Sequence, residues 1–419
     1  MGVRNYGPSF RNAEKSRAER ARVLILRWVG FVAGIAVLAG TAASVVGTLV
    51  LPRGVHSRIS RVTERAVDAG FALITKPART YVQRDRILAW QGPATLLVRL
   101  GVWIGLLVCG FTLTLLPLVP GDVLHGFSEA GSSVFTLGYS PPSNTTGTVV
   151  DYVAAFAGLV VVGLQIGYLP TLYAAFNRRE SEVTLLVSRA GVPAWGPEIL
   201  ARTRWGIYDG DSRPVLNELF DRWERWSAEV AESHTTYLTL VRLRSPRPLT
   251  HWLTSSVAVM DAAALHLSLA PDREPKVAAR LCLRMGFTAL RQIAATMRLP
   301  VDEDPDPDQP ISVTYDQFAS AVEMLRSLNY PIQVSTEDAW PNFRGWRVNY
   351  EAVAYAMAYA VDAPPALWSG TRRWAFEPIR PTRPVARQAS DVRPRANGNS
   401  PDKREGPSTF TDAASELQP

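Results

Sequence analysis

The sequence predicts an all-α membrane protein whose membrane part is followed by a helical soluble domain. Three runs without a charged residue cover residues 28–51, 100–120 and 152–177. Each run is at least as long as the roughly 20 residues that a helix needs to cross a bilayer. Between residues 178 and 375, apolar residues recur at spacings of three and four, which is the period of amphipathic helices. No run of alternating β-branched residues is long enough to predict a sheet.

The first uncharged run, residues 28–51, is predicted to be a retained transmembrane helix rather than the core of a signal peptide. Such a core is only about 7–15 residues long, whereas this run is longer and is closed by Pro52. A basic N-terminal tail, residues 1–27, precedes the run. A strongly basic connecting segment, residues 52–95, follows it.

The composition favours contact with a membrane over contact with nucleic acid. The formal net charge of +7 would suit either nucleic acid or anionic lipid. Because membrane spans are predicted, basic segments beside the cytoplasmic membrane surface explain the charge more simply. We therefore expect membrane lipid as a partner and no nucleic acid. The two cysteines, Cys109 and Cys282, indicate neither a disulfide framework nor a cysteine metal site.

A short polar stretch, residues 122–147, separates the second and third uncharged runs. It contains Ser-Ser-Val-Phe-Thr-Leu-Gly-Tyr-Ser at residues 132–140. Backbone that is not helical is tolerated at membrane depth only where it lines water or is buried in protein. The stretch therefore predicts a re-entrant segment with a short helix and a filter. A plain turn that joins two membrane helices is the alternative.

The residues Thr136-Leu137-Gly138-Tyr139 resemble the selectivity filter of the potassium-channel pore-domain family, which has two helices and a pore loop. The filter of that family has the sequence Thr-x-Gly-Tyr-Gly. In this resemblance, residues 96–177 form the pore domain. Its outer helix covers 100–120, its pore helix about 123–135 and its inner helix 152–177.

The resemblance implies a filter in which backbone carbonyls replace the hydration shell of a potassium ion. The ion-binding residues that it implies are Thr136, Leu137, Gly138, Tyr139 and Ser140. Because one loop cannot enclose an axis, it also implies a homotetramer. It implies no catalytic residue, no metal other than the filter cation and no cofactor other than the permeant potassium ion.

The residue types in the filter fit this chemistry in part. Successive carbonyls point at one axis only if the backbone adopts torsions that a Cβ atom opposes, and Gly138 tolerates them. Thr136 offers a carbonyl and a hydroxyl, and Tyr139 can support the filter from behind through a hydrogen bond. The sequence departs from the family pattern at Ser140, which replaces the second glycine, and at Pro141, which replaces the usual aspartate.

The third run contains candidates for a gating hinge. Gly163 and Gly167 permit close helix packing, and Pro170 removes a backbone donor and favours a kink. Glycine and proline are also common in membrane helices without any gating role.

The expected topology places the filter outside and the segment 53–95 in the cytoplasm, where its arginines satisfy the positive-inside rule. A spanning helix at 28–51 then leaves the basic tail outside, against the same rule. We expect three spans, an external N-terminus and a multi-pass location in the plasma membrane.

Residues 178–375 are predicted to form a helical cytoplasmic domain that regulates or assembles the pore, with an unknown cytoplasmic partner or ligand. Expected helices cover 214–242, 250–269, 276–299, 314–328 and 349–362. The stretches 223–226, 263–266 and 281–287 are similar to a helical region of actinobacterial membrane proteins with a channel-type pore. The tail, residues 376–419, is rich in proline, arginine and serine and is predicted to be disordered.

An enzyme is not expected, because the sequence contains no dinucleotide-binding glycine motif, P-loop, nucleophile elbow or HExxH motif. A membrane cation channel is the leading hypothesis. One alternative is a membrane-anchored interaction or sensor protein with a degenerate, non-conducting pore unit. Another is an enzyme in the soluble domain, which would need convergent polar side chains in a pocket.

Overall fold

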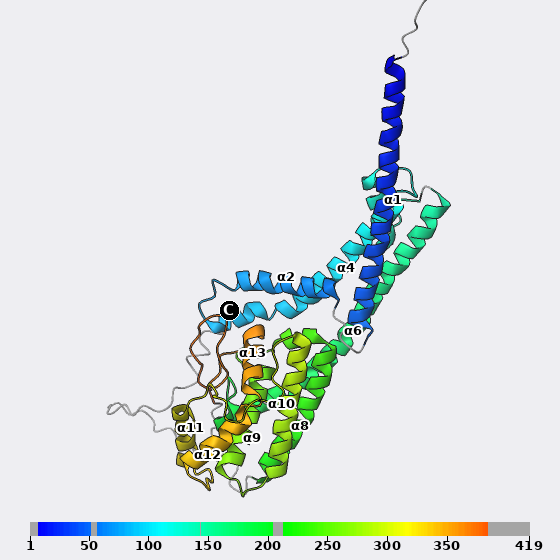
Figure 1. Ribbon diagram of the computed structural model, residues 1–419. Helices are drawn as coiled ribbons and strands as arrows, with labels where there is room; N and C mark the ends of the chain where they lie inside the picture. The colour runs from blue at the N-terminus through cyan, green and yellow to red at the C-terminus, as the bar shows by residue number, and fades with distance from the viewer. Residues whose placement is uncertain (1–6, 52–56, 143, 204–212, 384–419) are drawn as a thin grey trace, which may run out of the picture. The chain divides into compact units, whose positions relative to one another are not determined.

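The computed structural model describes residues 7–51, 57–142, 144–203 and 213–383, with the backbone alone for 7–16. These residues form helices and no strand, as the sequence predicts. The chain divides into two compact units (Figure 1). Unit 1 comprises Met1–Lys76 and Trp90–Ala174, and unit 2 comprises Pro77–Ala89 and Ala175–Pro419.

Unit 1 contains four helices and the first part of a fifth, within the residues that the structure describes. They are α1 (Gly7–Leu49), α2 (Arg58–Ile74), α4 (Gln91–Leu115), α5 (Val123–Val134) and α6 (Thr145–Ala190). Unit 2 contains the end of α6 and the remaining helices. These are α3 (Tyr81–Leu88), α7 (Gly196–Arg202), α8 (Arg213–Thr236), η1 (Leu238–Arg242), α9 (Trp252–Leu269), α10 (Lys276–Met297), α11 (Tyr315–Ser327), α12 (Thr336–Arg347) and α13 (Glu351–Val361).

Helices α1 and α4 pack closely and run antiparallel. A Cβ atom on Gly34 would lie 2.7 Å from the carbonyl oxygen of Gly110, so both glycines are needed for this approach. Further along, the indole Nε1 of the fully buried Trp103 donates to Ser44 Oγ at 3.0 Å. The pairing of 34 with 110 and of 44 with 103 fixes the antiparallel direction.

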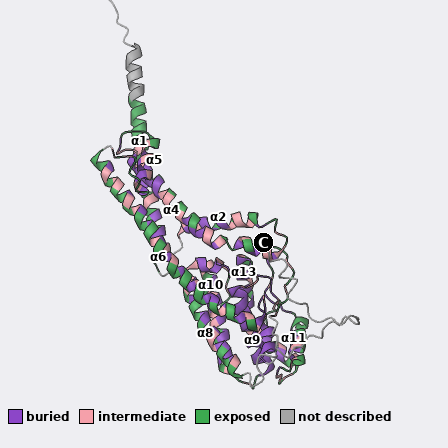
Figure 2. Ribbon diagram, turned by 180° about the vertical axis from the view of Figure 1, so that it is seen from behind, coloured by how far each residue is buried: buried purple, intermediate pink, exposed green. Residues whose placement is uncertain are grey.

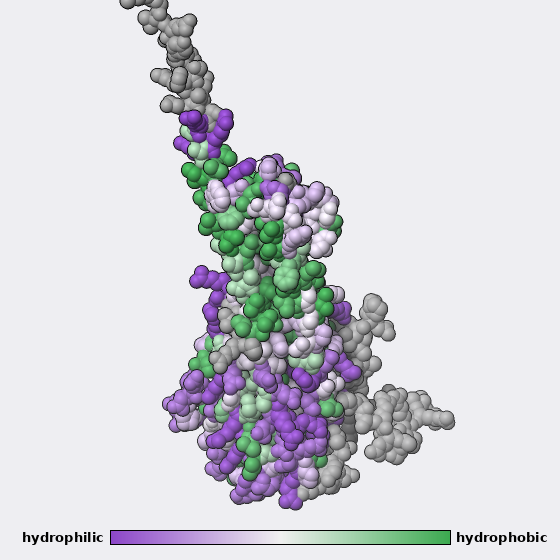
Figure 3. Space-filling model, turned by 90° about the vertical axis from the view of Figure 1, so that its right-hand side faces the viewer, coloured by the Kyte–Doolittle hydropathy of each residue, from purple (hydrophilic) through white to green (hydrophobic). Residues whose placement is uncertain are grey.

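Within the residues that the structure describes, four helical segments are long and apolar enough to cross a membrane, and this is compatible with a membrane protein. They are Arg17–Leu49, Tyr81–Leu115, Thr145–Ala190 and Trp252–Leu269. Figure 3 shows apolar side chains gathered over the surface of the long helices of unit 1. Val32 and Phe156, for example, are each 67% exposed.

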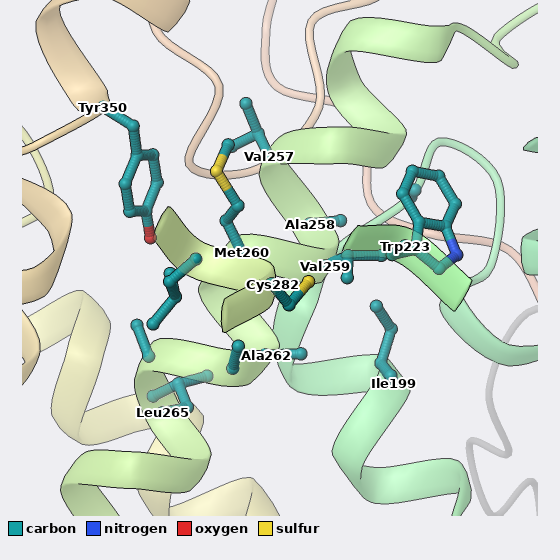
Figure 4. Packing of buried hydrophobic residues seen from close by; sticks show 14 of the residues in the cluster. Ile199, Trp223, Val257, Ala258, Val259, Met260, Ala262, Leu265, Cys282 and Tyr350 are labelled. Carbon is teal, nitrogen blue, oxygen red and sulfur yellow. The ribbon is translucent and has the colours of Figure 1, made fainter. Parts of the chain in front are cut away.

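The fourth of these segments, α9, forms the centre of unit 2. Every one of its residues is buried, as Figure 2 also shows. A helix that is apolar on all sides belongs either in a membrane or in a protein core. Helices α7, α8, α10, α12 and α13 pack against α9, and Figure 4 shows Trp223, Cys282 and Tyr350 around it. In this fold α9 is therefore a core helix, and it matches the soluble helix expected at 250–269.

Helix α3 belongs to unit 2, although it lies in sequence between two helices of unit 1. Arg84 pairs with Asp362, and Asp85 pairs with Arg244; all four side chains are buried. The hydroxyl of Tyr81 donates to the carbonyl oxygen of Asp362 at 2.7 Å. Residues from the connecting segment are thus built into the core of unit 2.

The structure departs from the sequence-based expectations at four places. Helix α1 begins at Gly7, inside the expected tail 1–27. The connecting segment 52–95, expected only to be basic, contains α2 and α3. Helix α12 was not expected. The expected disordered tail is ordered up to Arg383, whose guanidinium pairs with Glu198 at 2.6 Å. The rest of the tail, 384–419, lies outside the described residues.

Candidate functional site

A short helix, α5, precedes the Thr-Leu-Gly-Tyr residues where the sequence predicts a pore helix. The side chain of Asp122 accepts a hydrogen bond from the backbone N–H of His125 at 2.9 Å and so caps its first turn. The helix packs against α4 and ends at Val134, close to the expected boundary.

The residues after α5, 135–140, are called the filter segment here, and their backbone N–H groups bond back to the helix. The N–H groups of Thr136 and Leu137 donate to the carbonyl oxygens of Ser133 and Ser132, at 2.9 and 2.7 Å. The N–H of Ser140 donates to Ser132 Oγ at 3.2 Å. Several donors of the filter segment are therefore already satisfied by α5.

The carbonyl oxygens of the filter segment have no such partners. None of them accepts a hydrogen bond from the residues that the structure describes. The side chains beside them are open as well, since Leu137 is 64% and Tyr139 61% exposed. Backbone acceptors need a partner once they are removed from water. The segment thus offers acceptors to a group outside the single chain.

Two residues of the filter segment have left-handed backbone torsions. Gly138 has φ = 71°, as the sequence suggests, and Thr136 has φ = 54°. A β-branched residue with positive φ is rare and costs on the order of 1 kcal/mol. Such strain persists only where the surroundings enforce it, and it is concentrated at functional sites. The sequence alone gave no sign of this at Thr136.

The structure describes the surroundings of Ser140 and Tyr139 without testing the roles expected for them. Ser140, which replaces a family glycine, is not in the left-handed region, so no strain arises there. The Tyr139 hydroxyl lies near Gly131, 3.9 Å from where a Cβ atom would be. It makes no hydrogen bond to the described part of this chain. Support of the filter by Tyr139 therefore remains a prediction.

A buried carboxylate lies on α5, and the sequence-based reasoning missed it. Glu129 is completely buried, and neither of its carboxylate oxygens has a hydrogen-bond partner among the described residues. The imidazole of His125 lies nearby, with its Nε2 3.7 Å from Glu129 Oε2. A lone acidic residue inside the short apolar helix was the available signal in the sequence.

A glycine other than the predicted ones positions α6 against the end of α5. A Cβ atom on Gly158 would lie 2.1 Å from the carbonyl oxygen of Val134, the last residue of α5. Gly163 and Gly167 have nothing within 4 Å of such an atom. Pro170 lies inside α6, which runs without a break from Thr145 to Ala190. The close approach thus depends on Gly158, and a hinge at the other three stays a prediction.

Arg99 lies deep in unit 1 and contacts three helices. Its side chain is 2% exposed, and Nη1 lies 4.0 Å from Glu64 Oε1 of α2. The guanidinium also lies 5.4 Å from the ring centroid of Trp103 and 6.0 Å from that of Tyr168 on α6. Its Nε and Nη2 have no hydrogen-bond partner among the described residues. The sequence-based reasoning did not select Arg99.

Unit 2 has an open groove of about 530 Å³ between the end of α6 and α8. The lining side chains carry both charges, and Arg222 pairs with Glu218 and lies 3.8 Å from Glu182. Within the described residues, no group of three histidine, cysteine, aspartate or glutamate side chains could hold a metal ion. The groove therefore indicates no particular reaction.

Comparisons with known proteins add no relative. No protein-family model matches the chain, and neither a curated protein nor a solved structure is significantly similar to it.

Proposed function

We propose that this chain is a subunit of a multi-pass cation channel of the plasma membrane, conducting potassium and assembled as a homotetramer. The observation that carries the proposal is the division of roles in the filter segment. The N–H groups of residues 135–137 and of Ser140 bond to α5, whereas the carbonyl oxygens of the segment have no donor in the described chain. A row of free carbonyl oxygens is the kind of ligand that a dehydrated alkali cation needs.

The proposed mechanism is replacement of water by backbone oxygen. The carbonyls of Thr136, Leu137, Gly138 and Tyr139 take the place of the hydration shell as the ion enters. The left-handed torsions at Thr136 and Gly138 alternate along the segment, and such alternation helps to turn successive carbonyls to one side. Four copies around an axis complete the ring that one segment cannot form.

The organisation of the units supports the expected topology. Residues 77–89 and the end of α6 belong to one unit, so they lie on one side of a membrane. The antiparallel packing of α1 on α4 puts the start of α1 at the filter end. There Arg27 Nη2 donates to the carbonyl oxygen of Gly121 at 2.6 Å. With the filter outside, the N-terminus is outside and unit 2 is cytoplasmic.

Potassium flux into liposomes that contain the purified full-length protein tests the proposal. We expect uptake in the wild type and its loss in Gly138→Ala, because φ = 71° is strained for alanine. Gly101→Ala is the matched control: its Cβ atom would meet nothing within 4 Å, so flux should persist. Absence of flux in well-folded wild-type protein would reject the channel.

The second candidate is a membrane-anchored interaction or sensor protein with a non-conducting pore unit. Ser140 and Pro141, which depart from the family filter, and the size of unit 2 favour it. The same experiment separates the two, since a sensor of this kind gives no flux in the wild type.

A further inference from the structure

Helix α2 lies at the level where two candidate membrane spans end. Its N-cap residue Ser57 shares a hydrogen bond of 2.6 Å with Ser44 near the end of α1. Its Asp68 accepts a hydrogen bond from Gln91, the first residue of α4, at 2.8 Å. Within unit 1, α2 runs across the direction of α1 (Figure 1). A helix held in this way lies along a membrane surface rather than through it.

The two faces of α2 differ in chemistry. The face that packs against unit 1 is buried and consists of Ser60, Thr63, Glu64 and Val67. The opposite face is exposed and carries both cationic and aliphatic side chains. It consists of Arg58, Val62, Arg65, Ala66, Ala69 and Leu73, with Arg61 at its edge. Val62 is 64% and Leu73 62% exposed. We call this surface the outer face of α2.

The arginines of the outer face are not neutralised by the chain. Arg58, Arg61 and Arg65 form no ion pair with any residue that the structure describes. The acidic residues of α2 point elsewhere: Glu64 lies beside Arg99, and Asp68 bonds to Gln91. Exposed guanidinium groups beside exposed aliphatic side chains suit a surface that is anionic above and apolar below.

We propose that the outer face of α2 binds anionic phospholipid headgroups of the cytoplasmic leaflet. Arg58 and Arg65 contact phosphate groups, and Val62 and Leu73 insert between the first methylenes of the acyl chains. Because the buried face of α2 carries Glu64 against Arg99, a lipid that holds α2 also stabilises the start of α4. The inference requires unit 1 to lie in a membrane, but it does not require the protein to conduct ions.

Titration of the detergent-purified full chain with a soluble short-chain phosphatidylglycerol tests the inference, with thermophoresis as the readout. Short-chain phosphatidylcholine is the neutral comparison, and glycerol phosphate tests whether a free phosphate suffices. We expect at least tenfold tighter binding of phosphatidylglycerol than of phosphatidylcholine. Arg58→Gln with Arg65→Gln should weaken it about 20-fold, since each arginine near an anionic surface contributes roughly a factor of five.

The matched control is the double variant Arg280→Gln with Arg284→Gln. It removes the same charge from exposed positions on α10, and it should leave the affinity unchanged. Val62→Ser with Leu73→Ser should weaken binding of the lipid but not of glycerol phosphate.

Three outcomes would overturn the inference. They are equal affinity for both lipids, an equal loss in the α10 control, and glycerol phosphate that binds as tightly as the lipid. The liposome flux measurement is independent of all three. Loss of lipid binding can therefore be told apart from failure of the channel proposal.

Discussion

Arg347 in unit 2 and Arg99 in unit 1 are both buried, but their surroundings differ. Arg347 Nε donates to Glu351 Oε2 at 2.5 Å, Nη1 pairs with Asp261, and Nη2 donates to the carbonyl oxygen of Trp368 at 2.6 Å. Arg99 has one carboxylate at 4.0 Å and two nitrogens without a partner in the described chain. The hydrogen bonds of a fully bonded buried charge compensate its removal from water and stabilise the fold. A partly bonded buried charge needs further hydrogen-bond partners from neighbouring molecules.

The same contrast extends to other groups of unit 1. Glu129 and the amide oxygen of Gln165 are buried without hydrogen bonds to the described residues. The filter segment adds exposed carbonyl oxygens. In the proposed assembly, further copies, an ion and lipid supply these partners. The network around Arg347 is thus bonded within one chain, whereas Glu129, Gln165 and the filter segment would find their partners only in the proposed assembly.

We expect the largest loss of stability when the hydrogen-bonded network around Arg347 in unit 2 is broken. Arg347→Met leaves the carboxylates of Asp261 and Glu351 buried without their cation. This should cost about 3–5 kcal/mol of unfolding free energy, measured by denaturant unfolding of the full chain. Arg326→Met is the control, since Arg326 is exposed, pairs with Glu323 and donates a long hydrogen bond to Thr336 Oγ1 at 3.4 Å; it should cost less than about 1 kcal/mol. Equal losses in Arg347→Met and Arg326→Met would show that the buried network stabilises unit 2 no more than an exposed ion pair does.

Acidification should also weaken unit 2, because two of its histidines are buried in neutral form. Burial, and then the charge of Arg179, hold the pKa of His234 well below its usual value of 6.5. Burial and then Arg244 do the same for His251. Arg179 Nη1 donates to His234 Nε2 at 3.0 Å, a bond that requires the neutral ring.

The direction of this change of stability with pH follows from proton binding. Below pH 6.5 the unfolded state binds protons at both histidines and the folded state does not, so stability falls as the pH falls. Each histidine contributes up to about 1.4 kcal/mol per pH unit, or about 2–3 kcal/mol for both at pH 5.5. Unfolding at pH 7.5, 6.5 and 5.5 measures the change. If His234→Gln leaves the pH slope as steep as in the wild type, His234 does not have this role.

The next prediction concerns the contact between α5 and α6. Gly158→Ala places a methyl group 2.1 Å from the Val134 carbonyl oxygen, so the end of α5 must move. We expect a loss of about 1–3 kcal/mol in stability and loss of potassium flux. Gly40→Ala, whose Cβ atom meets nothing within 4 Å, should change neither. Normal potassium flux in Gly158→Ala would show that conduction through the filter segment does not depend on the contact between α5 and α6.

The smallest loss of stability is expected for a substitution of Arg99, and it can be compared directly with the loss caused by Arg347→Met. Arg99→Met removes a guanidinium that is only partly bonded and keeps an unbranched side chain against Trp103 and Tyr168. We expect a stability loss of about 1 kcal/mol or less, well below that of Arg347→Met under the same denaturant conditions. A loss as large as that of Arg347→Met would show that Arg99 is already fully stabilised within one chain.

The helices that could be predicted from the sequence are those in which apolar residues recur regularly at spacings of three and four. The core helix α9 was expected at 250–269 and covers Trp252–Leu269, and α10 matches its expected range almost as well. The helix before the filter segment and the left-handed torsion at Gly138 were also anticipated, since a glycine at that position has a direct backbone reason.

The missed elements have different physical causes. The buried face of α2 is mostly polar, with Ser60, Thr63 and Glu64, so a search for apolar spacing does not find it. Helix α12 is short and contains Pro341, a residue type that is rare inside helices. Gly158 and Arg99 owe their roles to neighbours distant in sequence, and a single sequence without contacts does not place those neighbours.

The position of α3 has a consequence for how unit 2 acts on the rest of the chain. The chain leaves unit 2 at Ala89, directly before α4, and enters it again within α6. The buried pairs of Arg84 with Asp362 and of Asp85 with Arg244 tie α3 to the α13 end of that unit. A truncation at residue 175 would therefore leave part of unit 2, residues 77–89, in the shortened chain. Unit 2 is joined through the backbone both to α4 and to the first part of α6.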